Sequence, residues 1–218
     1  MKLLNSLLRR KFQSGDYWRQ RYEKGRTSGP GSYGRLSEYK AQIVNGIVED
    51  RAIRSVIEFG CGDGNQSALF DIPRYVGIDI SPLVIDRARS TFADRPDWSF
   101  EVADKKVRTV GGHDMSMSLD VIYHLVEDDV FDSYMRDLVS AARRYVLIYA
   151  SDHDETTADV HVRHRKYSDW LARKAPEFKL ATNYEQPYPT GADTDPNNTS
   201  FAHFKLFKIT QIASKMDS

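Results

Sequence analysis

The segment VIEFGCGDGNQS, at residues 56–67, is the strongest constraint that the sequence places on the fold. Its first half is a short run of apolar and β-branched residues, which predicts a buried strand. Glycines then occupy every second position, at Gly60, Gly62 and Gly64. They let the backbone turn tightly and approach a ligand without interference from a Cβ atom. A strand that ends in such a turn is typical of the βα units that build parallel sheets.

Strands and helices alternate along the rest of the chain. Apolar runs predict strands at 54–60, 74–80, 98–104, 114–123, 143–151, 178–184 and 201–210. Apolar periodicity and capping signals predict helices at 36–48, 82–92, 127–142 and 167–175, with a brief helix ended by Pro73. We therefore expect an α/β fold: a doubly wound, Rossmann-like, seven-stranded sheet, mostly parallel, with an antiparallel hairpin at its C-terminal edge. Ligands of such sheets bind at the carboxyl ends of the strands.

A second glycine-rich stretch, GPGSYGRL at residues 29–36, imitates a phosphate-binding loop. Arg35 and Leu36 stand where the lysine and the hydroxyl residue belong, and no apolar strand precedes it. Its aromatic, basic and glycine residues suit a hinged segment that folds over a bound ligand. We expect residues 1–34 to form an N-terminal helix and glycine-rich lid, apart from a domain at 35–218. The alternative is a flexible extension. The lid residues expected nearest the ligand are Tyr22, Thr27, Ser28, Gly29 and Tyr33.

Three acidic residues accompany the first glycine turn. Glu58 precedes the glycines, Asp79 ends the second predicted strand and Asp104 closes the third. An acid at the end of the second strand can accept two hydrogen bonds from a ribose diol. A dinucleotide fingerprint would need glycine at position 65 or 67, where Asn65 and Ser67 stand. An adenosine that carries an amino acid and a sulfonium, without phosphate, is therefore favoured over NAD or ATP.

The order of these motifs resembles the class I S-adenosylmethionine-dependent methyltransferases over residues 56–150. Acid-x-Gly-x-Gly-x-Gly, an acid ending the next strand, an Asp after the third, and SLDVIYHL near the fourth follow one another. With SGPGSYGRL and HVRHR, the sequence is also similar to a bacterial subgroup of unassigned substrate. The resemblance implies S-adenosylmethionine as cofactor and S-adenosylhomocysteine as product. The cofactor-binding residues that it implies are Glu58, Phe59, Gly60, Cys61, Gly62, Gly64, Asn65, Asp79 (ribose), Ile80, Asp104 (adenine), Leu119 and Asp120.

The alternative for the glycine turn is a plain βα connection with no ligand. Cys61, the single cysteine of the chain, is expected to fill space between the glycines rather than act as a nucleophile.

Asp120, Tyr123 and His124 follow the fourth predicted strand, where the resemblance places the methyl donor. Methyl transfer from a sulfonium mainly requires that the enzyme align the acceptor with the methyl group and exclude water. A base is needed only when the reacting atom of the acceptor carries a proton of high pKa. His124 is the first candidate for that base, since a neutral imidazole suits pH 7. Its alternative role is to cap the next helix or to pack against the cofactor.

A cationic cluster, HVRHRK at residues 161–166, follows the fifth predicted strand, where the connection lies over the active-site edge. We expect its side chains to bind a carboxylate or phosphate of the acceptor, or else to form a solvated basic face. Metal ligation is not expected, because the chain has no cysteine-rich or H-E-x-x-H pattern. The residues in question are His161, Arg163, His164 and Arg165.

The expected function is methyl transfer to an oxygen of a small polar metabolite, such as a sugar or an anionic compound. The alternatives are a non-catalytic cofactor- or protein-binding relative and, disfavoured, an NAD-dependent oxidoreductase. Lys+Arg and Asp+Glu both number 31 in a chain of 218 residues, so neither nucleic acid nor membrane is an expected partner. One cysteine and no export signal predict a reducing, cytoplasmic location. A monomer and a homodimer remain equally open.

Overall fold

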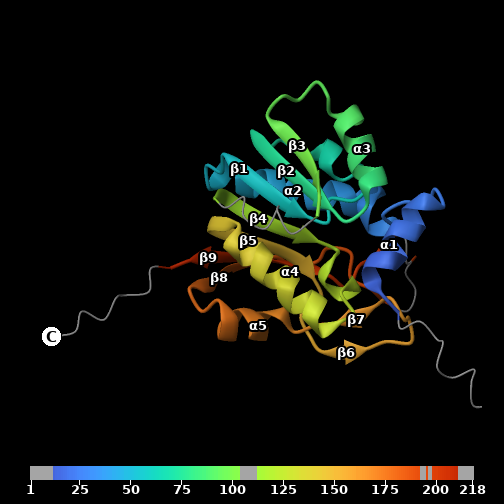
Figure 1. The fold of residues 1–218 in the computed structure, drawn as a ribbon. Coiled ribbons are helices and arrows are strands. Elements are labelled where there is room, and N and C mark those ends of the chain that lie inside the picture. The colour runs from blue at the N-terminus through green and yellow to red at the C-terminus, as the bar shows by residue number, and fades with distance from the viewer. Residues whose placement is uncertain (1–11, 104–111, 192–194, 196–197, 211–218) are drawn as a thin grey trace, which may run out of the picture.

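The computed structural model describes residues 12–103, 112–191, 195 and 198–210. One mixed sheet of seven strands organises it (Figure 1), in the order β3-β2-β1-β4-β5-β9-β8. The strands are β1 (Ser55–Phe59), β2 (Arg74–Asp79), β3 (Trp98–Val102), β4 (His113–Leu119), β5 (Ala142–Ala150), β8 (Phe178–Asn183) and β9 (His203–Ile209). The first five are parallel. The last two form an antiparallel hairpin that pairs with β5. The predicted fold class is confirmed.

Five helices accompany the sheet in the part of the chain that the structure describes. They are α1 (Ser14–Glu23), α2 (Gly34–Asp50), α3 (Pro82–Thr91), α4 (Asp128–Ser140) and α5 (Tyr167–Lys174). Single 3₁₀ turns lie at Pro30–Ser32, Ser67–Leu69 and Ile122–His124. None of the described helices is long and apolar enough to cross a membrane.

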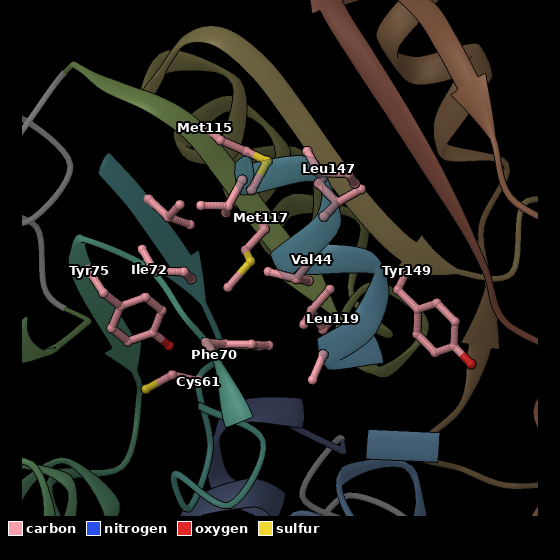
Figure 2. Packing of buried hydrophobic residues seen from close by; sticks show 14 of the residues in the cluster. Val44, Cys61, Phe70, Ile72, Tyr75, Met115, Met117, Leu119, Leu147 and Tyr149 are labelled. Carbon is pink, nitrogen blue, oxygen red and sulfur yellow. The ribbon is translucent and has the colours of Figure 1, made fainter. Parts of the chain in front are cut away.

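Alternate residues of the central strands face two separate cores. On one side, Val44 of α2 packs with Met117 of β4 and Leu147 of β5 (Figure 2). On the other side, Val146 and Ile148 of β5 pack with residues of α4 and α5. Because successive strand residues point to opposite faces, a continuous apolar strand such as β5 is what a sheet covered on both faces requires.

Two local features differ from the sequence-based expectation. The strand predicted at 114–123 ends at Leu119, because Asp120 adopts a positive φ of 59° that breaks the extended backbone. A small two-stranded sheet of β6 (Glu155–Thr156) and β7 (Arg163–His164) lies in the connection after β5. The first eleven residues of the predicted N-terminal helix and lid at 1–34, and the predicted adenine contact Asp104, lie outside the described residues.

Candidate active site

A cavity of about 550 Å³ lies at the carboxyl ends of β1, β2 and β4. From β1 the chain continues outward through β2 and β3 on one side of the sheet, and then through β4 and β5 on the other side. Open α/β sheets bind ligands at such a switch point, which here lies beside β1. The volume is within the usual range for a site that encloses a small molecule. The predicted cofactor residues that line it are Glu58, Phe59, Gly60, Cys61, Gly62, Asp79, Ile80, Leu119 and Asp120.

The glycine turn wraps around the end of β2. Gly60 N and Cys61 N both donate to Ile78 O, at 2.7 and 3.0 Å. Gly62 has a φ of 63°, and a Cβ atom there would lie 2.4 Å from Ser28 Oγ. Glycine is therefore required at position 62 both by the backbone conformation and by the N-terminal segment packed on it.

Asp79 is buried at the end of β2 and is held by two backbone groups. Gly62 N donates to Oδ2 at 3.1 Å and Ser81 N donates to Oδ1 at 2.9 Å. Burial raises the pKa of Asp79 to about 6, although these backbone donors act in the opposite direction. Each carboxylate oxygen keeps a further acceptor position, which suits a pair of ligand hydroxyls.

Two more buried polar groups line the same cavity. The hydroxyl of Tyr75 donates to Glu58, and burial raises the pKa of Glu58 to about 7. Gln66 Nε2 donates to Ser37 O at 3.0 Å, while Gln66 Oε1 is buried with no hydrogen-bond partner among the described residues. An unsatisfied acceptor and a carboxyl group in the lining of one cavity favour a ligand that brings hydrogen-bond donors, such as an ammonium.

The half-buried Asp120 contacts two buried side chains, Lys40 and Tyr123. Lys40 Nζ lies 2.6 Å from Asp120 Oδ2, and the lysine side chain is only 1% exposed. Tyr123 OH donates to Asp120 Oδ1 at 2.8 Å. Asp120 and Lys40 line the cavity, whereas Tyr123 contacts it through Asp120. The sequence-based prediction missed Lys40, although a lysine spaced four residues from both Leu36 and Val44 lies in the apolar stripe of its helix.

His124 lines the cavity and is neutral at physiological pH. Burial lowers its pKa to about 4. Its Nδ1 lies 2.9 Å from the carbonyl oxygen of His161. A carbonyl only accepts, so the tautomer assigned to His124 carries its proton on Nδ1 and its lone pair on Nε2. Trp18 meets the ring edge to face at 4.8 Å.

The N-terminal segment covers this end of the sheet (Figure 1). Ser14 N and Oγ donate to the two carboxylate oxygens of Glu127, at 2.8 and 2.7 Å. Ser28 N donates to Asp63 Oδ2 at 2.8 Å, and Asp63 N returns a bond to Ser28 Oγ at 3.0 Å. Tyr33 OH donates to the same Asp63 oxygen at 2.9 Å.

Two of the predicted lid residues, Tyr22 and Ser28, line the cavity. Tyr33 lies outside its lining and is bonded to Asp63. Gly64 and Asn65 also lie outside the lining, and Asn65 Nδ2 donates to Ser32 O at 2.6 Å. Asn65 therefore contacts the segment that covers the glycine turn.

The cationic cluster is engaged within the chain. Arg163 Nη1 lies 3.0 Å from Asp128 Oδ1. Arg165 pairs with the same carboxylate and also donates to Leu125 O and Val126 O, at 3.0 and 2.7 Å. In the described chain, His161, Arg163, His164 and Arg165 are all absent from the cavity lining. Arg163 and Arg165 hold the turn that leads into α4, whereas His164 Nδ1 lies 2.7 Å from Ser151 Oγ.

The sequence matches no family model and no curated protein. Solved structures share its fold. Magnesium protoporphyrin IX methyltransferase (ChlM) from Synechocystis PCC 6803 with bound SAM has a TM-score of 0.62 at 16% identity, covering 91% of this chain and 98% of that one. N-methyltransferase NodS from Bradyrhizobium japonicum WM9 in complex with S-adenosylhomocysteine has a TM-score of 0.60 at 17% identity, with 80% and 87% covered.

The methyltransferase domain of bacterial CtHen1-C also has a TM-score of 0.60, at 18% identity, with 80% of this chain and 99% of that one covered. The chain therefore has the class I methyltransferase fold. A small RNA methyltransferase, HEN1, has a TM-score of 0.58 at 14% identity, with 82% of this chain and 26% of that one covered. The expectation that nucleic acid is excluded as a partner consequently finds no support in these comparisons.

Proposed function

We propose that the protein is an S-adenosylmethionine-dependent methyltransferase that methylates an oxygen of a small polar acceptor. The observation that carries the proposal is the cavity at the strand switch point, which Gly60 and Gly62 of the glycine turn, Asp79 and the Asp120–His124 turn all line. The shared fold supports the proposal, because ChlM and NodS, which have this fold, were crystallised with SAM and S-adenosylhomocysteine, respectively.

The donors and acceptors of the cavity suit this cofactor. Asp79 would accept from the ribose hydroxyls with the acceptor positions that Gly62 and Ser81 leave free. Glu58 and the unpartnered Gln66 Oε1 would accept from the ammonium of the amino-acid end. When bound, the sulfonium supplies an electrophilic methyl group with a good leaving group.

The chain's own residues would orient the acceptor and exclude water. Nε2 of neutral His124 can accept a hydrogen bond from a hydroxyl of the methyl acceptor. This bond would orient a lone pair of the hydroxyl oxygen toward the methyl group. With a pKa of about 4, the imidazole holds a proton weakly, so its main role is orientation. Trp18 and Tyr22 cover the cavity from the N-terminal segment and keep water from the reacting atoms.

Binding of the cofactor is tested by calorimetric titration of the full chain with S-adenosylhomocysteine and, separately, with NADH. We expect binding of S-adenosylhomocysteine only. Binding of NADH alone would favour an oxidoreductase and overturn the proposal, and so would the failure of both ligands to bind.

The acceptor is tested with methyl-labelled S-adenosylmethionine and two pools, extracted polar metabolites and small RNA. We expect label in a small metabolite as an alkali-stable methyl ether. Label in the RNA pool alone would refute the small acceptor and keep the methyltransferase. No transfer in either pool, with the cofactor bound, would favour a non-catalytic binding protein.

A further inference from the structure

Two histidines and a glutamate meet at the small β6–β7 sheet, away from the cavity lining. Glu155 and His164 are register partners in the antiparallel pair, and His153 lies two residues before Glu155. One potential ligand atom from each of the three residues lies within 4.8 Å of the others. His153 Nε2 and Glu155 Oε2 are 3.2 Å apart.

The neighbouring carboxylates have other partners. Asp152 accepts from Ser168 N at 3.0 Å and pairs with Lys205. Asp154 accepts from Lys166 N at 3.0 Å. The carboxylate of Glu155 instead lies against the two imidazoles. A carboxylate and two imidazoles form a ligand set that first-row divalent metals prefer.

His164 is already oriented by a second residue. It is buried, and its Nδ1 lies 2.7 Å from Oγ of Ser151, which is also buried. A histidine that ligates a metal through one nitrogen typically donates from the other to such an oxygen, which fixes the ring.

We propose that His153, Glu155 and His164 bind a zinc ion, with the fourth position open to water. Zinc–nitrogen and zinc–oxygen bonds of 2.0–2.2 Å place neighbouring ligand atoms of a tetrahedron about 3.3 Å apart. His153 and Glu155 already have that separation. The ligand atom of His164 lies within 4.8 Å of the other two. The side chains of His153 and Glu155, which are 52% and 61% exposed, would have to turn toward it to complete the site.

The ion would have a structural effect on the candidate active site. It joins β6 to β7 beside Ser151, the residue that follows β5. The same connection carries His161, whose carbonyl oxygen bonds His124 and whose ring stacks on Tyr17 at 4.8 Å. Zinc would therefore fix the position of the carbonyl that sets the tautomer of His124, without contacting the cavity itself.

The test uses the full chain after treatment with a chelator. We expect calorimetry to find one Zn²⁺ per chain, and Co²⁺ to give the visible absorption of a tetrahedral site. Zn²⁺ at 100 times its Kd should raise Tm by about 5–10 °C. His153→Ala and Glu155→Gln should each weaken zinc binding by about tenfold or more. Asp159→Asn, an exposed acid between β6 and β7, is the matched control and should bind as the native chain does.

Equal Tm values for all variants in chelator would show that they fold alike. The proposal is overturned if Zn²⁺ does not bind, or if it binds equally well to both ligand variants. These outcomes are independent of methyl transfer, since none of the readouts uses the cofactor.

Discussion

Burial raises the pKa of both Glu58 and Asp79, so the stability of the ligand-free fold depends on pH. The carboxyl group of Glu58 has an ordinary pKa of 4.5, and burial in the folded chain raises this pKa to about 7. Between these two pH values the folded state binds more protons than the unfolded state, so its stability falls as pH rises.

Glu58→Gln should therefore stabilise the ligand-free chain, because glutamine keeps the acceptor for Tyr75 OH and does not ionise. The gain over the native chain should be small at pH 4.5 and should grow to at most about 3 kcal/mol above pH 7. Urea unfolding at pH 4.5, 6 and 7.5 measures it, with the exposed Glu49→Gln as control. Parallel pH profiles for Glu58→Gln and the native chain would contradict the burial of a titrating carboxyl group.

Asp79→Asn tests the ribose contact. Asparagine keeps one acceptor oxygen and places a donor where the second oxygen stood, so one backbone N–H and one ligand hydroxyl lose their acceptor. We expect S-adenosylhomocysteine affinity to fall by about 1–3 kcal/mol, or roughly 5- to 150-fold. The 2′-deoxy analogue of the same ligand should lose affinity in the native chain and much less in the variant. Calorimetry measures both, and Asp71→Asn, exposed beyond the glycine turn, is the control. An equal loss for the analogue in both proteins would refute the contact.

The residues of the site differ in how visible they are from sequence. Gly60, Gly62 and Asp79 were predictable because a tight turn and a strand end impose local requirements that few residues meet. Lys40 was not, because its partner Asp120 lies 80 positions away and only the folded sheet brings them together.

At the scale of elements, α1 depends on tertiary contacts. A helix of ten residues is marginal alone in water, and the first residue of α1 is held by Glu127, at the start of α4. Glu127 makes no side-chain cap of its own helix. Removing its carboxylate should therefore loosen α1 and leave α4 intact.

Glu127→Ala should accelerate amide exchange in residues 14–23 by roughly tenfold or more, since hydrogen bonds to charged groups contribute about 1.5–3 kcal/mol each. Exchange in α4 and β4 should not change. Mass spectrometry of peptides from these segments measures the effect, with Glu23→Ala at the other end of α1 as the matched control. Unchanged exchange in α1 would mean that its aromatic contacts alone hold it.

Two elements show where the sequence misleads. The β-branched pair Val121 and Ile122 prolongs the apolar run of β4, yet the positive φ of Asp120 ends the strand before them. The β6–β7 pair has two residues per strand, too few for any alternation to be read. The cluster of His153, Glu155 and His164 was not predicted either. Strand register places Glu155 opposite His164, and the spacing of these residues along the chain does not indicate that pairing.

At the scale of the molecule, different interactions hold the sheet and the N-terminal segment that covers it. The described residues of the three buried clusters all lie at or after Tyr39, in α2 and beyond. The segment before α2 instead contributes polar contacts to Asp63 and Glu127 and aromatic contacts to the cavity. The sheet was therefore predictable from apolar periodicity, whereas the docking of the segment depends on side-chain pairs that periodicity does not describe.

Deleting residues 1–34 tests this division. The truncated chain should unfold cooperatively with a lower Tm, because both apolar cores and all of α2 except its first residue, Gly34, remain. It should lose methyl transfer, since Trp18 and Tyr22 no longer exclude water from the cavity and Ser28 no longer packs on Gly62. Circular dichroism checks the fold, calorimetry checks S-adenosylhomocysteine binding, and labelled S-adenosylmethionine checks transfer. Transfer at the native rate by a folded truncated chain would show that the segment is an attachment to the fold and no part of its active site.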